Sequence, residues 1–361
     1  MGKYLSQREL SGERSSFDSG KKRRRRIKPR EADAKPQGDD ADDDSGSKKT
    51  IFAAMAANLG IAVTKFGAAL FTGSSSMLAE GIHSLIDTTN QVLLLVGLKR
   101  AKKPADEAHP FGYGSEIYFW AFMVAIFLFA LGSGVSIYEG VAGLMASESE
   151  SLKSPSIALG VLFIAFCFEG YSWTVAWKEF QERRKGDGFF KDFQRLKDPS
   201  IFVVLFEDSA ACIGIIIAAI AVGLTWMTGN HVYDAVGSIA VGVVLGITAI
   251  LLAVEVKGLL IGETADPEIE TKIQEMVGKR DEIIAINELR TLHLGPNDVL
   301  MTMSVDFKDD VVSQTIERIV TEIEEEVKKR YKFVRKLYVE VQSQSGHERF
   351  ADPFEGEGAS S

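Results

Sequence analysis

The sequence predicts an integral membrane protein: an all-α polytopic domain of six transmembrane helices, followed by a small α+β cytoplasmic domain. Six apolar stretches lie between residues 51 and 255, each near the roughly 20 residues that a helix needs to cross a bilayer. After Gly262 the chain turns polar and shows both helical and strand periodicity. Lysine and arginine gather in alternate loops. These three observations define the fold class.

The apolar stretches set the order of the membrane domain. They cover residues 51–73, 76–98, 115–145, 156–180, 199–227 and 231–255. The third and fifth are longer than a bilayer requires, so we expect them to tilt or protrude. Basic residues cluster after the second and fourth stretches, whereas the loops after the first and fifth contain none. By the positive-inside rule, both termini are predicted to be cytoplasmic.

Composition limits the possible functions. The net charge of -9 comes from polar ends, while 46% of all residues are hydrophobic. Residues 1–50 hold a basic run, 21–26, and an acidic run, 39–44, and they are predicted to be disordered. A basic run can bind nucleic acid, but beside a membrane domain we expect it to stay cytoplasmic or to touch anionic lipid. The two cysteines, Cys167 and Cys212, lie in apolar segments, which excludes a disulfide framework or a CxxC site.

The last third of the chain predicts a compact cytoplasmic domain. Helical patterns over 266–278 and 311–331 alternate with strand patterns over 283–294, 299–307 and 336–342. The order αββαβ predicts a ferredoxin-like sheet with helices on one face. The predicted domains are a disordered tail 1–50, a transport domain 51–262, a dimerisation domain 263–342 and a disordered tail 343–361.

A histidine and an aspartate lie four residues apart inside the second apolar stretch. His83 and Asp87 share one helix face at this spacing. Ionisable groups at membrane depth are costly and by default mark an ion path or a proton relay. An imidazole and a carboxylate also make half of a tetrahedral site for a divalent metal. The alternative is a hydrogen-bonded pair that only fixes helix packing.

Several motifs together resemble the cation diffusion facilitator family of zinc-transporter-like metal/proton antiporters. The second stretch reads Ser-Met-Leu-Ala-Glu-Gly-Ile-His83-Ser-Leu-Ile-Asp87, and the next loop reads Pro104-Ala-Asp-Glu-Ala-His-Pro-Phe-Gly-Tyr-Gly114. The sixth stretch begins Asp234-Ala-Val-Gly-Ser-Ile-Ala-Val-Gly242. The resemblance covers about residues 51–342. It implies a homodimer formed through the soluble domain and a divalent metal as transported substrate, with no prosthetic group.

The resemblance also implies a metal site closed by two ligand pairs, from the second and fifth helices. Asp208 matches the family's aspartate on the fifth helix, but the ligand position four residues earlier is Val204. Glu207 is the candidate replacement, because its longer side chain can swing toward the site. Cys212, four residues after Asp208, is a weaker candidate whose thiolate would suit zinc. The Glu-Asp pair suggests the branch that includes mitochondrial-type zinc transporters.

A peripheral site is a second possibility. Asp106 and His109 could bind a metal in the cytoplasmic loop, although Tyr113 stands where the family has a further histidine. The soluble domain is poor in ligands, since His293 is its only histidine before the tail. We therefore expect that domain to serve dimerisation without a metal cluster.

The predicted function is export of a divalent metal from the cytoplasm in exchange for protons. Zinc is the first candidate, and a site of one nitrogen and several oxygens also admits manganese, iron or cobalt. Ligands shed protons to bind metal, so both compete for one site, and His83 is the candidate proton-coupled group. The alternative is a non-transporting relative that stabilises or regulates a partner subunit. It is suggested by Val204, an apolar residue at a position where the family has a ligand. No catalytic constellation or P-loop indicates an enzyme. The expected location is a bacterial cytoplasmic membrane, or else an organelle membrane.

Overall fold

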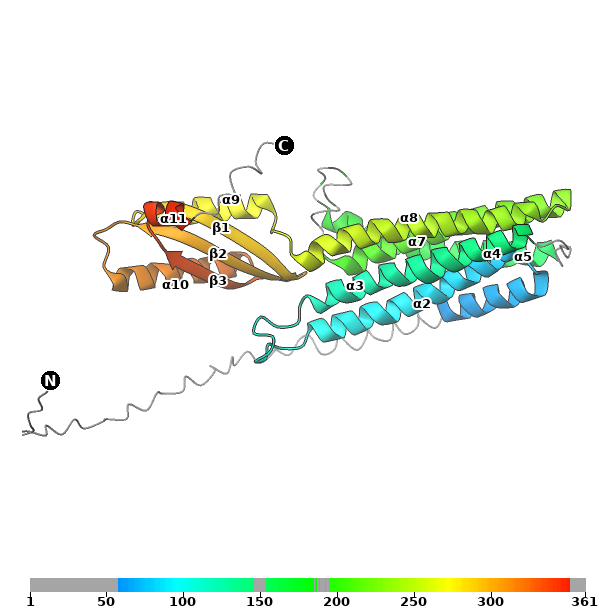
Figure 1. Cartoon of the computed structure of the whole chain (residues 1–361). Helices are drawn as coiled ribbons and strands as arrows, with labels where there is room; N and C mark the ends of the chain where they lie inside the picture. The colour runs from blue at the N-terminus through cyan, green and yellow to red at the C-terminus, as the bar shows by residue number, and fades with distance from the viewer. Residues whose placement is uncertain are drawn as a thin grey trace, which may run out of the picture. The chain divides into compact units, whose positions relative to one another are not determined.

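The protein consists of a bundle of long helices and a small domain with a three-stranded sheet (Figure 1). The computed structural model describes residues 58–145 and 154–350, apart from positions 185, 187, 189–191, 193, 194 and 196. The predicted tail 1–50, the start of the first apolar stretch and residues 351–361 lie outside the described residues.

The described bundle follows the predicted order of helices. Residues 58–72 are helical and lead into α2. The third stretch forms one continuous rod in which a π-helical turn, Leu128–Ser133, separates two α-helices. The elements are α2 Ser75–Ala101, α3 Glu116–Phe127, α4 Gly134–Met145, α5 Pro155–Arg183, α7 Pro199–Thr228 and α8 Val232–Ile261.

Four spans among the described residues are long and apolar enough to cross a membrane. They are the rod Glu116–Met145, the segment Pro155–Glu182 of α5, and the whole of α7 and α8. Helix α2 has 27 residues but carries Glu80, His83 and Asp87 in its middle. The predicted helical membrane domain is thus supported by four spans, and the count of six stays a prediction.

Local sequence explains where the long helices begin and end. The side chain of Ser74 accepts a hydrogen bond from the backbone N–H of Met77, which caps the start of α2. Asp198 caps α7 in the same way, and Pro199 occupies the first turn, where no N–H partner is needed. Helix α7 ends at Gly229, whose φ of 68° suits a residue without a side chain.

Packing separates an apolar bundle interior from an apolar outer surface. The interior includes Tyr118, Phe202 and Leu245, all fully buried. Large apolar side chains such as Leu70 and Phe163 are exposed on the outside. A helix bundle that is apolar on both its inner and outer faces is typical of a protein surrounded by lipid.

The soluble domain has the predicted αββαβ order. Its elements are α9 Pro267–Gly278, β1 Ile283–Gly295, β2 Asp298–Phe307, α10 Ser313–Arg330 and β3 Val334–Val341. The sheet order is β1-β2-β3, with β1 and β2 antiparallel and β2 and β3 parallel. Buried residues of α9, α10 and the strands, including Ile273, Met301 and Ile323, form one core.

The predicted disordered tail from residue 343 is wrong over its first residues. Gln344–Phe350 form a short helix, α11. The backbone N–H of Gln344 donates to a carboxylate oxygen of Asp306 at 2.9 Å, and that of Gly346 donates to Ser343 Oγ at 3.2 Å. These acceptors satisfy the N–H groups at the helix start. Asp306 belongs to β2, a long-range partner that local composition could not indicate.

Candidate metal transport site

Helix α2 holds His83 and Asp87 together inside the bundle. His83 Nε2 lies 3.5 Å from a carboxylate oxygen of Asp87, so the predicted shared face is confirmed. Both residues are buried, and His83 is fully so. Within the part of the chain that the structure describes, neither ring nitrogen of His83 nor Asp87 Oδ1 has a hydrogen-bond partner. Buried polar atoms without partners are uncommon and costly, so these atoms are available to a ligand.

Helix α7 turns its two neighbouring carboxylates toward different helices. Glu207 is buried, and its Oε1 accepts a hydrogen bond of 2.6 Å from Asn90 Nδ2 on α2. Asn90 lies three residues after Asp87, on the same side of α2. Asp208 instead accepts a hydrogen bond of 2.7 Å from Ser172 Oγ on α5. Adjacent helical residues point about 100° apart, which explains why Glu207 approaches α2 while Asp208 approaches α5.

A further buried carboxylate joins this acidic cluster. Glu169 of α5 is only 7% exposed. Asp87 lies within Coulombic range of Glu207, Glu169 and Asp208. Among the described residues, no three or more His, Cys, Asp or Glu side chains are arranged to hold a metal ion. The structure therefore gathers several buried carboxylates in one region of the bundle without bringing them together at a single point.

The two remaining positions on α7 behave differently. Val204 packs against the apolar interior, as its chemistry requires. Cys212 is a free, half-buried cysteine. Neither observation tests whether Cys212 is a metal ligand. The ligand set of the membrane site stays a prediction.

The sequence analysis did not identify a buried ion pair near this cluster, between Lys65 and Glu80. Lys65 Nζ, in the helix 58–72, lies 3.1 Å from Glu80 Oε2 on α2, and both side chains are fully buried. The same ammonium donates to Ser84 Oγ at 2.8 Å. The signal that could have found the pair was available, because both residues are ionisable and lie within apolar stretches of membrane length.

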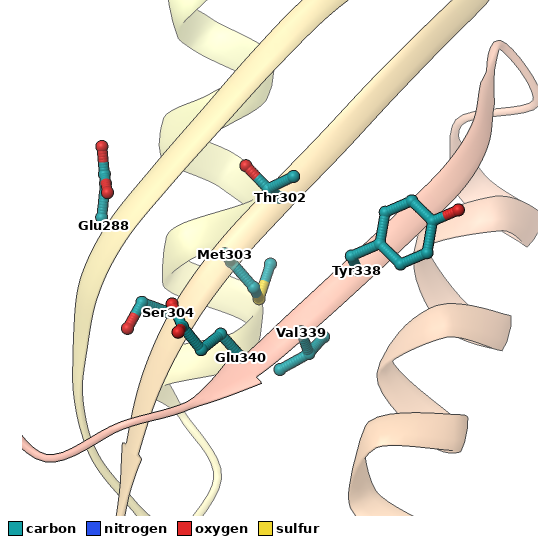
Figure 2. Close-up of a pocket in the computed structure, with 7 residues that line it drawn as sticks. All are labelled: Glu288, Thr302, Met303, Ser304, Tyr338, Val339 and Glu340. Atoms are coloured by element: carbon teal, nitrogen blue, oxygen red, sulfur yellow. The ribbon is translucent and has the colours of Figure 1, made fainter. Parts of the chain in front are cut away.

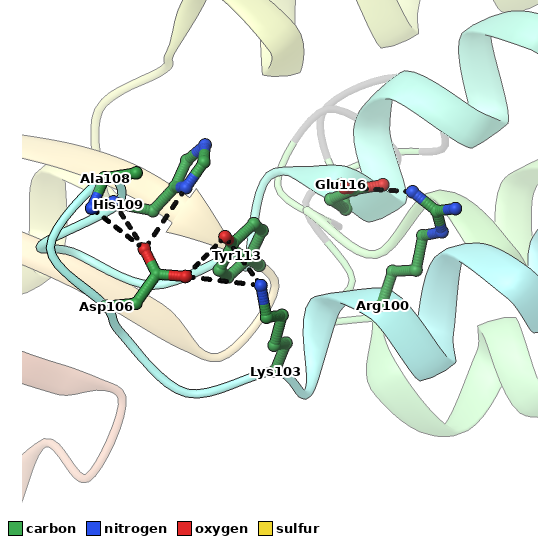
Figure 3. Close-up of polar contacts among 7 residues, drawn as sticks. All are labelled: Arg100, Lys103, Asp106, Ala108, His109, Tyr113 and Glu116. Atoms are coloured by element: carbon green, nitrogen blue, oxygen red, sulfur yellow. Dashed lines mark hydrogen bonds and ion pairs between the residues drawn. The ribbon is translucent and has the colours of Figure 1, made fainter.

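The predicted peripheral site is a hydrogen-bonded loop in this structure (Figure 3). One oxygen of Asp106 accepts from the backbone of Ala108 and His109. The other accepts from the Tyr113 hydroxyl at 2.7 Å and the Lys103 ammonium at 3.2 Å. Above all the Tyr113 hydrogen bond, and then the loop backbone, hold the pKa of Asp106 well below its usual range. Both oxygens of Asp106 thus have protein donors, which favours a structural role.

The soluble domain offers a shallow pocket on its sheet but no histidine beside it. Figure 2 shows the lining, which comes from all three strands. The pocket has a volume of about 300 Å³. His293 is buried elsewhere, with Nδ1 3.2 Å from the carbonyl oxygen of Gly295. The lining residues are Glu288, Thr302, Met303, Ser304, Tyr338, Val339 and Glu340.

A family model and several known proteins match this chain, and their names refer to the handling of metal ions. A family model described as the cation efflux transmembrane domain matches residues 51–261. A human protein named proton-coupled zinc antiporter SLC30A9, mitochondrial, is 34% identical over 288 residues, covering 78% of this chain and 50% of its own length. Metal tolerance protein C4 of Arabidopsis thaliana is 32% identical over 275 residues, covering 75% of this chain and 59% of its own.

A bacterial relative matches at lower identity but over nearly its whole length. The manganese efflux system protein MneP of Bacillus subtilis is 23% identical over 303 residues, covering 82% of this chain and 95% of its own. By contrast, the chain spans only about half the length of the human and mouse relatives that it matches.

Proposed function

Because this chain belongs to the cation efflux family, whose transmembrane domain it matches over residues 51–261, we propose that it exports a divalent metal cation from the cytoplasm in exchange for protons. The predicted resemblance to cation diffusion facilitators, including the mitochondrial-type branch, is confirmed. The printed names of relatives refer to zinc and to manganese. We propose zinc as the first substrate, with manganese, iron or cobalt as further candidates.

The observation that carries the proposal is the buried His83–Asp87 pair, whose free ring nitrogens and carboxylate oxygen lie on the α2 side of the acidic cluster. We propose His83 and Asp87 as one ligand pair and the two carboxylates of α7 as the other. Glu207 is favoured over Asp208 as the first ligand on α7, since it already reaches α2 through Asn90. One imidazole with carboxylate oxygens suits zinc and also admits harder divalent cations.

Proton exchange follows from the same ligands. Carboxylates and imidazole bind metal only when deprotonated, so metal binding releases protons and protonation releases metal. The buried acidic cluster concentrates proton-binding groups where the cation would lie. We propose His83 as the proton-coupled group, because imidazole changes its charge near neutral pH. No resident cofactor and no enzymatic reaction are part of this proposal.

The proposed setting is a bilayer that six helices cross, with both termini on the cytoplasmic side. The soluble αββαβ domain is proposed to form a homodimer without a metal cluster. A bacterial cytoplasmic membrane and an organelle membrane both remain candidate locations. A non-transporting role in stabilising a partner subunit is the competing function.

Metal-driven proton flux in proteoliposomes tests the proposal. Purified protein is reconstituted with a zinc-sensitive dye and a pH-sensitive dye inside the vesicles, and a zinc gradient is applied. We expect Asp87→Asn to abolish both signals, and Glu207→Gln to weaken zinc binding about tenfold or more while it keeps the side-chain size. Glu255→Gln, at a half-buried carboxylate of α8, is the matched control and should transport normally.

The outcomes separate the competing assignments. Near-normal transport by Asp87→Asn would remove the proposed membrane site. Normal transport by Glu207→Gln together with loss in Asp208→Asn would transfer the ligand role on α7 to Asp208. A parent protein that folds and binds its partner copy but moves neither zinc nor protons would favour the non-transporting role.

A further inference from the structure

The buried ion pair between Lys65 and Glu80 lies in the membrane bundle yet is not used by the ligand set described above. Lys65 is the only lysine or arginine among the described residues whose side chain is buried. Glu80 Oε2 accepts a hydrogen bond from Lys65 Nζ at 3.1 Å, whereas Glu80 Oε1 has no hydrogen-bond partner among the described residues. That free oxygen lies against Gly214 of α7, where a side chain would collide with it.

Glu80, the member of the pair that belongs to α2, lies on the same helix face as the proposed ligands His83 and Asp87. Glu80 precedes His83 by three residues and Asp87 by seven, which is the spacing of one helix face. Ser84, the second partner of the Lys65 ammonium, lies on this face as well. Glu80 therefore places a second buried carboxylate on the face of His83, one helical turn nearer the start of α2.

The ionisable side chains near Lys65 belong to three other helices, α2, α5 and α7. Every one of these groups lies within Coulombic range of its ammonium. The groups are Glu80, His83 and Asp87 of α2, Glu169 of α5 and Cys212 of α7.

Stability alone does not account for the ion pair. A buried ion pair gives little or no net stabilisation compared with apolar residues of similar size. Glu80 also leaves one oxygen unsatisfied inside the protein, at a cost that a fully apolar pair would avoid. Ionisable residues inside membrane helices by default mark the path of an ion.

We propose that Glu80 is a second metal-binding position of the transport path, one helical turn from His83, and that the Lys65 ammonium is the internal cation that holds this position until a metal displaces it. The inference rests on the proposed metal transport. In this arrangement a divalent cation passes between the Asp87 and Glu80 sides of His83, and Lys65 returns to Glu80 after the cation leaves. Competition by Lys65 keeps the second position weak, so that metal is released.

Zinc affinity and maximal transport rate of the full chain test this proposal. Lys65→Met removes the competing ammonium and frees Glu80, so zinc should bind roughly tenfold more tightly and the maximal rate should fall by a similar factor. Adding Glu80→Gln should return the affinity to within about threefold of the parent, while the rate stays low because the second position is gone. Lys257→Met, at an exposed position of α8, is the matched control and should change neither quantity.

The design remains decisive when a single variant does not fold. Lys65→Met leaves a buried carboxylate unpaired and risks misfolding, whereas the double variant leaves no unpaired charge. A double variant with the parent's affinity and the parent's maximal rate would overturn the inference. Unchanged zinc affinity in a folded Lys65→Met protein would overturn it as well, while the Asp87 site would stand. A parent that binds none of zinc, manganese, iron and cobalt would overturn both this inference and the proposed function.

Discussion

Asp234, at the start of α8, joins that helix to the start of α2. Its Oδ1 accepts hydrogen bonds from Ser74 Oγ at 2.7 Å and from Ser76 Oγ, and its Oδ2 accepts from the backbone N–H of Ser75 at 2.6 Å. The carboxylate is buried and faces the positive end of the α2 dipole. We predict that Asp234→Ala is strongly destabilising, because it removes all three contacts at once.

The structure sets the size of this effect. Hydrogen bonds to a charged acceptor contribute about 1.5 kcal/mol each at the lower end, so three would contribute about 4.5 kcal/mol. The variant also relieves the cost of burying a carboxylate, and the two serine hydroxyls can still bond each other, since they lie 3.1 Å apart. We therefore expect a net loss of about 3 kcal/mol in the free energy of unfolding.

Reversible unfolding in mixed detergent, followed by tryptophan fluorescence, measures the loss. A double-mutant cycle with Ser76→Ala isolates one of the three contacts. Ser76→Ala alone should cost about 1 kcal/mol. It should cost clearly less in the Asp234→Ala background, where only the Ser74–Ser76 hydrogen bond is left to lose. Thr89→Ala, at an exposed hydroxyl of α2, is the control. If the free-energy changes of Ser76→Ala and Asp234→Ala were fully additive, the proposed hydrogen bond between Ser76 and Asp234 would be refuted.

Two further predictions concern packing and pH. Gly140→Ala should destabilise the protein by about 1–3 kcal/mol, because a methyl group there would lie 2.6 Å from the Ala235 carbonyl oxygen on α8, whereas Gly160→Ala, with open space around it, should unfold like the parent. Equal unfolding midpoints for the two variants would contradict this. Burial lowers the pKa of His293 below its unfolded value near 6.5, so the folded state binds fewer protons, and this contribution to stability is lost as pH falls below about 6.5. The difference in unfolding free energy between pH 7 and pH 5 should be smaller in His293→Gln than in the parent, and an equal difference would exclude His293 as the cause.

Periodicity was sufficient to predict most elements of the fold. The strands β1 to β3 alternate apolar and polar residues in a soluble setting, so their order and approximate ends could be predicted. The π-helical turn Leu128–Ser133 could not, because its residues continue the apolar helical stretch and nothing in their order indicates a change from α- to π-helical hydrogen bonding. Helix α11 was missed because its start depends on Asp306, a residue distant in sequence.

The sequence predicted that His83 and Asp87 lie together, but it could not predict how the two carboxylates of α7 are oriented. Spacing placed His83 and Asp87 on one face of α2, since both belong to one helix. The directions of Glu207 and Asp208 depend on how α7 is rotated about its axis, and packing across the bundle sets that rotation. Sequence alone offered both carboxylates as ligands, whereas the structure gives one to Asn90 and the other to Ser172.

The carboxylates around the site share one property that bears on reversible transport. Glu207 accepts from Asn90, Asp208 accepts from Ser172 and Glu80 accepts from Lys65, so each already has a protein donor on a different side chain. A cation that binds these oxygens must displace donors rather than enter a set of bare charges, and part of its binding energy is offset by the bonds that it breaks. If a cation bound there leaves, the same donors can bond these three carboxylates again, so none of the three is left without a donor. A transporter needs this balance, because a site that binds its ion too strongly cannot release it on the other side. If the proposed ligands bind the metal, we expect donor residues such as Asn90 and Ser172 to affect its release as directly as the ligands affect its binding.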